Sequence, residues 1–219
     1  MKFIGIILLL LTSIFLIACS ANQASNKISN SELENLASKY GGVYIFNKKF
    51  YDEIEKREAE RKELSKSLGD KIRSNPRKIK QGDKFITIYD VDMTLINDKL
   101  PRTLSNGKRY YTIWTTYESE TGKKVKISKE FTDKIKNFIG LENYKNSGAS
   151  IDMSYFYIDK DNIAIPIRLT LNFYNISKSY GLYGDEGRGI SFSKERLINI
   201  AGDNVFYFDS SKNTFVKEK

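Results

Sequence analysis

The chain has 219 residues, of which 40% are hydrophobic and 29% are charged, a balance typical of folded globular proteins. It carries 36 lysines and arginines against 27 aspartates and glutamates, but it has no histidine and a single cysteine. These absences exclude Ser-His-Asp and Cys-His nucleophile systems, zinc sites built on imidazole or thiolate, and disulfides within the chain. Any catalysis would therefore depend on carboxylates, Lys, Tyr or Ser, together with a hard cation such as Mg²⁺.

The N-terminal residues have the pattern of a secretory signal peptide. Lys2 precedes an apolar run of 16 residues, 3–18, which is shorter than the about 20 residues that a membrane-spanning helix needs. The run ends in "LIAC", which is similar to the lipobox of bacterial lipoproteins, where the cysteine is acylated and becomes the first residue of the mature chain. This resemblance implies a signal peptide over 1–18, a lipid on Cys19 and a flexible tether over 19–30. The competing interpretation is an ordinary cleavable signal with a chance cysteine.

The same resemblance implies where the protein acts. A lipid on Cys19 would hold the chain on a membrane of the bacterial cell envelope, because each buried methylene of an acyl chain contributes about 0.8 kcal/mol. Ser20 follows the cysteine, which in the lipoprotein pattern favours the outer membrane if the host is Gram-negative. The net charge of +9 leaves room for a polyanionic partner, whereas no motif indicates a specific nucleic acid.

Residues 31–80 are predicted to form a helical segment. "SELE" has the form of a capping box, with Ser31 and Glu34, and predicts a helix over 32–40. A longer helix is predicted over 48–73, ending before a proline.

The middle of this longer helix, "EKREAERKE" at 55–63, has alanine as its only apolar residue. One hypothesis is a coiled-coil arm or partner helix through which a structural envelope component contacts another protein. The other is a solvated helix docked at both ends. The second is favoured because the heptad pattern is not sustained.

Residues 81–219 are predicted to form an α+β domain, because the hydrophobic period changes from 3.6 to 2. The clearest strand is 163–174, "IAIPIRLTLNFY", which is expected to pair with 150–158 through the turn "DKDN". Further hairpins are predicted for 110–119 with 123–127 and for 204–209 with 213–218, and helices for 129–139 and 193–200. The predicted fold class is α+β: N-terminal helices followed by a mainly antiparallel sheet built from hairpins with inserted short helices.

Two carboxylates follow an apolar strand pattern in "ITIYDVDMTL", residues 86–95. This segment resembles motif I of the haloacid dehalogenase-like phosphohydrolases. The resemblance implies that Asp90 is the nucleophile and a Mg²⁺ ligand, that Asp92 is the general acid and base, and that Thr94 supports the turn. The competing interpretation is one strand over 85–96, with Val91, Met93 and Leu95 inward and the polar side chains toward solvent.

A glycine-rich segment, "GLYGDEGRG" at 181–189, is interpreted as either a surface loop or a phosphate-binding loop between a strand and a helix.

Taken together, the sequence predicts a lipid-anchored envelope lipoprotein that is non-catalytic and binds a protein, glycan or polyanion. The alternatives are a Mg²⁺-dependent phosphohydrolase using Asp90 and Asp92, and a structural envelope component that interacts through the charged helix.

Overall fold

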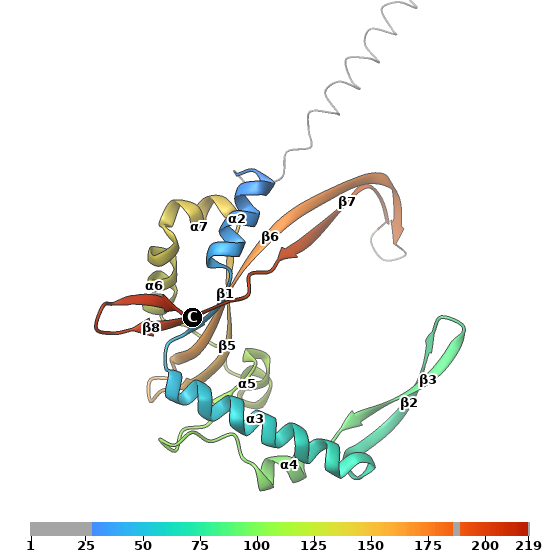
Figure 1. Cartoon of the computed structure of the whole chain (residues 1–219). Helices are drawn as coiled ribbons and strands as arrows, with labels where there is room; N and C mark the ends of the chain where they lie inside the picture. Colours follow the sequence, from blue (N-terminus) through green and yellow to red (C-terminus); the bar gives the residue numbers. More distant parts are fainter. Residues whose placement is uncertain (1–27, 186–188, 219) are drawn as a thin grey trace, which may run out of the picture. The chain divides into compact units, whose positions relative to one another are not determined.

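The computed structural model describes residues 28–185 and 189–218. The predicted signal peptide, Cys19 and most of the predicted tether lie outside the described residues. Early helices are followed by a sheet rich in antiparallel hairpins (Figure 1), which confirms the predicted α+β class. In the described part of the chain, no helix is both long enough and apolar enough to cross a membrane.

The chain divides into two compact units by its contacts, and the first contains residues up to 43, 133–152 and 170–205. It begins with α2 (Asn30–Tyr40), whose capping box is formed by Ser29 and Glu32. The predicted box, Ser31 with Glu34, is therefore wrong by two residues. Residues 29–32 also fit the S-x-x-E pattern. Because the helix begins at Asn30, the box of Ser29 and Glu32 is the one that satisfies its first backbone N–H groups.

The end of α2 is fixed by Asn204, a buried residue of the same unit. Its side-chain amide donates hydrogen bonds to the carbonyl oxygens of Ser38 at 2.9 Å and Gly41 at 2.8 Å. A Cβ at Gly202 would collide with the carbonyl oxygens of Ala37 and Gly41, so this close approach requires glycine. The last carbonyls of the helix are thus satisfied by a segment that lies far away in the sequence.

The second unit contains residues 44–132, 153–169 and 206–218. Its helices and strands from the first half of the chain are α3 (Lys48–Leu68), η1 (Gly69–Ile72), β2 (Arg73–Gln81), β3 (Lys84–Val91), α4 (Thr94–Lys99), β4 (Tyr110–Tyr111) and α5 (Trp114–Thr121). Ile54 of α3 is fully buried against Leu104, Tyr110 and Ile167. This apolar cluster holds one face of α3.

The main sheet has the strand order β4-β5-β6-β1-β8-β9, and β7 pairs with β6. Its strands are β1 (Gly42–Ile45), β4, β5 (Ser150–Ile158), β6 (Ala164–Asp185), β7 (Gly189–Ile200), β8 (Asn204–Asp209) and β9 (Thr214–Lys217). The predicted strand pair around "DKDN" and the C-terminal hairpin are confirmed by β5 with β6 and by β8 with β9. Helices α6 (Lys129–Ile139), also as predicted, and α7 (Leu141–Ser147) precede β5.

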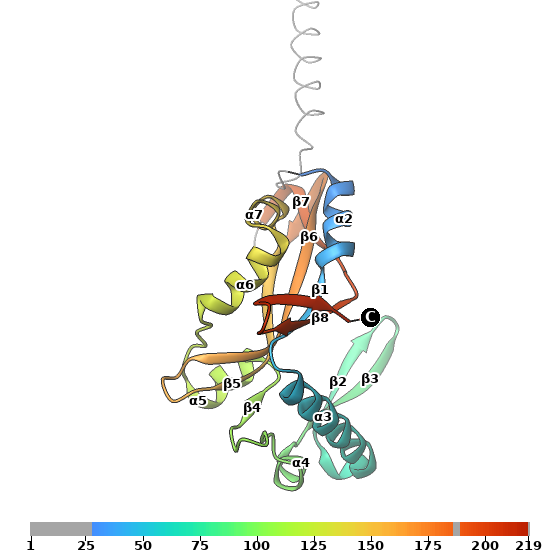
Figure 2. The same cartoon turned by 60° about the vertical axis from the view of Figure 1, so that its left-hand side comes forward.

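Three local predictions are wrong. Residues 193–200 are part of strand β7, because they pair with β6 rather than fold on themselves. The predicted hairpin of 110–119 with 123–127 is not formed, because residues 114–121 form the helix α5 and 123–126 belong to no strand. Helix α5 packs Tyr117 against Tyr111 at a centroid distance of 5.2 Å. The third error concerns the end of the helical segment: residues 73–81 are strand β2, which pairs with β3 as a separate two-stranded sheet. We call residues 73–91 the β2–β3 ribbon, and it extends from the end of α3 and η1 (Figures 1 and 2).

Candidate functional site

Asp90 lies near the end of β3, and both of its carboxylate oxygens have partners from β2. The guanidinium of Arg77 donates to Oδ1, and the side-chain amide of Asn75 donates to Oδ2 at 3.3 Å. Asp90 stands opposite Ser74 in the antiparallel ladder. The carboxylate therefore joins the two strands of the β2–β3 ribbon at its base.

Asp92 has a different structural role, at the start of α4. Its Oδ1 accepts a hydrogen bond of 2.9 Å from the backbone N–H of Thr94, and its own N–H donates to Ile72 O. The Thr94 hydroxyl and then the Thr94 N–H hold the pKa of Asp92 below its ordinary value. Asp92 thus holds the turn that leads into the short helix α4, whose N-cap residue is Met93.

The arrangement that the phosphohydrolase resemblance implies is not formed here. Motif I of that family belongs to a parallel sheet, whereas β3 pairs only with β2, antiparallel, among the described strands. The competing prediction of one strand over 85–96 is also wrong, because β3 ends at Val91 and α4 begins at Thr94. Among residues 28–185 and 189–218, no three His, Cys, Asp or Glu side chains gather as metal ligands.

The glycine-rich segment 181–189 lies at the end of the β6–β7 pair. Gly181 to Asp185 belong to β6 and Gly189 begins β7, while residues 186–188 lie outside the described residues. A strand follows the segment, so the helix N-terminus that a phosphate-binding loop would use is not present after it. The prediction that this segment joins a strand to a helix is therefore wrong.

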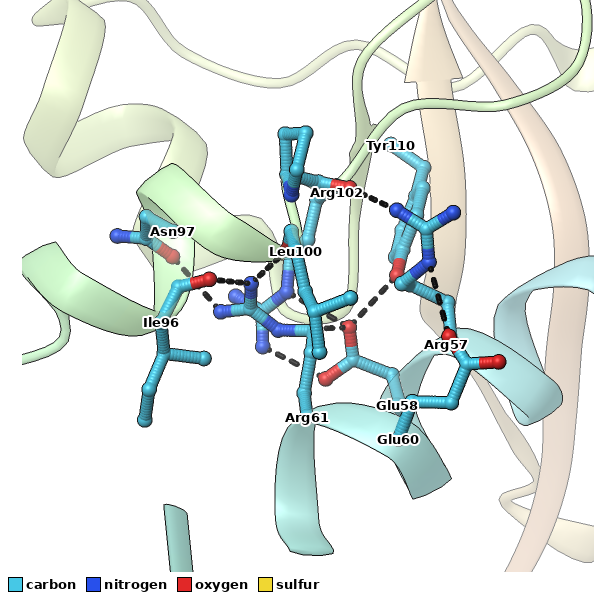
Figure 3. A network of polar contacts seen from close by, with 10 residues as sticks. Arg57, Glu58, Glu60, Arg61, Ile96, Asn97, Leu100, Arg102 and Tyr110 are labelled. Carbon is cyan, nitrogen blue, oxygen red and sulfur yellow. Dashed lines mark hydrogen bonds and ion pairs between the residues drawn. The ribbon is translucent and has the colours of Figure 1, made fainter. Parts of the chain in front are cut away.

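The charged middle of α3 is largely exposed, as predicted, at Glu55, Lys56, Ala59, Glu60, Lys62 and Glu63. The prediction that the helix is docked only at its two ends is wrong, because this middle also carries the most buried charge of the second unit. The guanidinium of Arg61 is 3% exposed. It donates to the backbone carbonyls of Ile96 and Leu100 and, at 2.7 Å, to the Oδ1 of Asn97 (Figure 3). Arg61 therefore fastens α3 to the helix α4 and its end.

Glu58, one turn earlier on α3, neutralises this buried cation and holds a second one. Its carboxylate lies 3.5 Å from Nε of Arg61 and accepts two hydrogen bonds of 2.8 Å from Arg102 and one of 2.7 Å from the Tyr110 hydroxyl (Figure 3). We call Glu58, Arg61, Arg102 and Tyr110 the Arg61 network.

The electrostatics of the Arg61 network follow from its burial. Burial alone would raise the pKa of Glu58, but the hydrogen bonds from Arg102 and Tyr110 and the nearby cations outweigh it, so the pKa lies below its ordinary value. Burial and then the bond to Glu58 raise the pKa of Tyr110. Burial and then repulsion by Arg102 lower the pKa of Arg61. Nε of Arg61 has no hydrogen-bond partner, but the other contacts join α3 to residues 96–110, so the network is a structural clamp between them.

A groove of about 450 Å³ lies beside this clamp. Its walls come from α3 and the segment after α4: Glu53, Lys56, Arg57, Glu60, Thr103, Leu104, Ser105 and Tyr110. Most of its charges are already bonded, since Glu53 accepts from Ser105 at 2.7 Å and Arg57 donates to Pro101 O at 2.8 Å. The groove therefore offers few free groups to a ligand.

Two pairs of strands, the β2–β3 ribbon and the β6–β7 pair, expose large apolar side chains to solvent. Large apolar side chains that are two-fifths or more exposed lie on the β2–β3 ribbon (Ile79, Phe85, Tyr89 and Val91) and on β6–β7 (Tyr180, Leu182, Ile190, Phe192, Leu197 and Ile198). Exposed apolar side chains gathered in this way mark interaction surfaces.

Comparison with protein-family models, with curated proteins and with solved structures finds no significant match.

Proposed function

We propose that this protein is a lipid-anchored lipoprotein of the bacterial cell envelope that acts without catalysis, by binding a partner protein through the β6–β7 ribbon (residues 173–185 and 189–200). One observation carries the proposal. Leu182, Ile190 and Phe192, near the end of the ribbon, are 72%, 70% and 76% exposed. Burying side chains of this size contributes about 1.5–3 kcal/mol each, which is enough to drive specific association.

The ladder places these three residues next to one another near the end of the ribbon. Ile190 and Phe192 are two residues apart on β7 and share one face. The register shifts between Tyr180, opposite Ser193, and Tyr183, opposite Ser191, so Gly181 and Leu182 together stand opposite Phe192 in a bulge. We call Leu182, Ile190 and Phe192 the apolar patch. A contiguous patch can be covered by one partner surface in one step.

The backbone of the ribbon favours a polypeptide over a glycan or a soluble polyanion. Among the described strands, β7 pairs only with β6, so its outer edge keeps unpaired N–H and C=O groups. A strand from a partner can add to such an edge in register and place its own apolar side chains on the patch. Sugars and polyanions have no matching row of alternating donors and acceptors.

The expected lipid on Cys19 completes the proposal. With the acyl chains in the bilayer and the residues before α2 as a tether, the protein would be held at the envelope and free to meet its partner there. Asp90 and Asp92 fit this non-catalytic role, because their carboxylates are engaged by Arg77, Asn75 and Thr94.

Photo-crosslinking in intact cells tests the proposal. A photoreactive phenylalanine analogue at position 192 is expected to give a discrete adduct with one envelope protein. The matched control carries the same analogue at Lys145, an exposed position on α7 of the same unit, and is expected to give no such adduct. Adding Leu182→Ser and Ile190→Ser to the position-192 variant should remove the adduct. The same adduct from position 145, or an adduct unchanged by the two serines, would contradict the proposal.

A further inference from the structure

The β2–β3 ribbon concentrates positive charge. Residues 73–91 contain five cations, Arg73, Arg77, Lys78, Lys80 and Lys84, and two anions, Asp83 and Asp90. One anion is consumed within the ribbon, because Asp90 is paired with Arg77. The ribbon therefore presents an excess of positive charge to its surroundings.

The register sorts these charges between the two faces. Lys78 is opposite Thr87 and Lys80 is opposite Phe85, so these four side chains share one face with Tyr89, two residues beyond Thr87. The ion pair of Asp90 with Arg77 lies on the other face, because Asp90 is one residue away from Tyr89. We call the face with Lys78, Lys80, Phe85 and Tyr89 the basic face.

The lysines of the basic face have no anion of their own. In the part of the chain that the structure describes, Lys78 and Lys80 make no hydrogen bond or ion pair through their side chains, and both residues are exposed. At the base of the ribbon, Arg73 lies over the ring of Tyr89 at 5.4 Å and is opposite Val91, which places a third cation on the same face. Arg73 is paired with Asp70, outside the ribbon.

Large apolar side chains stand between these cations. Phe85 is 71% exposed beside Lys80, and Val91 is 54% exposed beside Arg73. A soluble polyanion would attract the lysines but would leave Phe85 and Val91 in water. A bilayer surface with anionic headgroups meets both needs, because cations bind its phosphates while apolar side chains enter the boundary between headgroups and acyl chains.

We infer that the β2–β3 ribbon is a membrane-contact element that lays its basic face on anionic phospholipid headgroups. Lys78 and Lys80 bind headgroup phosphates, and Phe85 enters the boundary of the hydrocarbon region. This contact depends on neither the lipid on Cys19 nor the partner proposed for the β6–β7 ribbon. If Cys19 is acylated, the ribbon adds a second membrane contact to the lipid anchor.

Vesicle sedimentation tests the inference with a protein that begins at Ser20, which keeps every residue that the structure describes and removes the lipid. We expect binding to vesicles that mix phosphatidylglycerol with phosphatidylcholine, weakening as salt screens the charges, and little binding to phosphatidylcholine alone. Lys78→Gln with Lys80→Gln should weaken binding on the order of 30-fold. Phe85→Ser should weaken it on the order of 10-fold.

The control variant removes the same charge elsewhere, through Lys126→Gln and Lys160→Gln, which are exposed positions of the same unit. It should bind nearly as wild type does, and unchanged thermal unfolding of all variants shows that they fold. Three results would overturn the inference: equal binding to both vesicle types or to neither, an equal loss in the control, or a Phe85→Ser variant that binds normally while soluble polyphosphate competes fully. The last result would assign the ribbon to a soluble polyanion.

Discussion

Helix α3 and the β2–β3 ribbon are neighbours in the sequence, both are rich in charge, and both belong to the second unit, yet they use their charges in opposite ways. On α3, Glu58 and Arg61 are tied into a closed network with Arg102 and Tyr110. On the ribbon, Lys78 and Lys80 are exposed and unpaired within the described residues. Charges of the first kind hold the fold together, whereas charges of the second kind are available to a partner.

The difference arises from distant parts of the chain rather than from the segments themselves. Arg61 donates to acceptors on Ile96, Asn97 and Leu100, which lie 35 to 39 residues further along the chain, on a segment that folds back onto α3. Among the described residues, no such segment pairs with the ribbon, which is two strands wide. Local composition therefore does not distinguish a structural charge from a functional one.

The largest expected effect is the loss of Glu58. The Glu58→Ala variant would leave Arg61 and Arg102 as neighbouring cations without their counter-charge, which typically costs about 3–5 kcal/mol of unfolding free energy. Urea denaturation of the protein that begins at Ser20 would measure it. Glu63→Ala is the matched control, because Glu63 pairs with Lys66 on the exposed face of the same helix, and about 0.5 kcal/mol is expected. Equal losses in the two variants would contradict the clamp.

The Tyr110 hydroxyl should have the next largest effect. Tyr110→Phe removes a hydrogen bond of 2.7 Å to the charged Glu58 while keeping the buried ring, and bonds to charged groups contribute about 1.5–3 kcal/mol. Tyr89→Phe on the ribbon removes a hydroxyl from a half-exposed ring and should change stability by less than about 0.5 kcal/mol. Chemical denaturation compares the two, and a ranking in the reverse order would break the contrast.

The pH dependence of stability should carry the signature of Glu58. Its folded-state pKa lies below the ordinary value of 4.5, so its contribution is present above that pH and is lost as the pH falls through the lower folded-state value. Denaturation midpoints measured from neutral to acidic pH should therefore fall less steeply for Glu58→Gln than for wild type. Identical slopes would show that Glu58 does not titrate differently in the folded state.

The smallest effect on stability is expected on the ribbon. Lys78→Gln with Lys80→Gln should change the free energy of unfolding by less than about 0.5 kcal/mol, because both residues are exposed and their side chains make no hydrogen bond or ion pair with another described residue. Thermal unfolding would measure it. A loss above about 1 kcal/mol would mean that these lysines are part of the fold.

Periodic segments could be predicted from the sequence, and segments defined by distant partners could not. The alternation of 163–174 predicts that Ile167, Leu169 and Phe173 point inward, and all three are fully buried. It fails at the start of the strand, where Ile163, predicted inward, is 36% exposed and Ala164, predicted outward, is buried. The predicted inward side chains of 85–96 fail, since Val91 and Leu95 are 54% and 45% exposed. Val91 ends strand β3, and a two-stranded ribbon buries neither of its faces, whereas Leu95 lies on the short helix α4.

The candidate sites show the same limit. The D-x-D-x-T motif predicted one possible role for Asp90 and Asp92, but Arg77 and Asn75, which engage Asp90, come from the stretch 31–80, which was predicted as a helical segment. The Arg61 network was missed because its members are separated by up to 52 residues. No local signal marks Arg61 among the other charges of α3.

We interpret Asp90 as a structural residue that joins the two strands of the β2–β3 ribbon, rather than as a ligand of a catalytic Mg²⁺. Thermal unfolding of wild type and of Asp90→Asn, each with and without Mg²⁺, tests it most directly, with phosphate-ester hydrolysis followed in the same samples. We predict no Mg²⁺-dependent rise in the midpoint of either protein and no turnover that depends on Asp90. A midpoint that Mg²⁺ raises in wild type alone, or hydrolysis that Asp90→Asn abolishes, would contradict the account and make the carboxylate pair an active site.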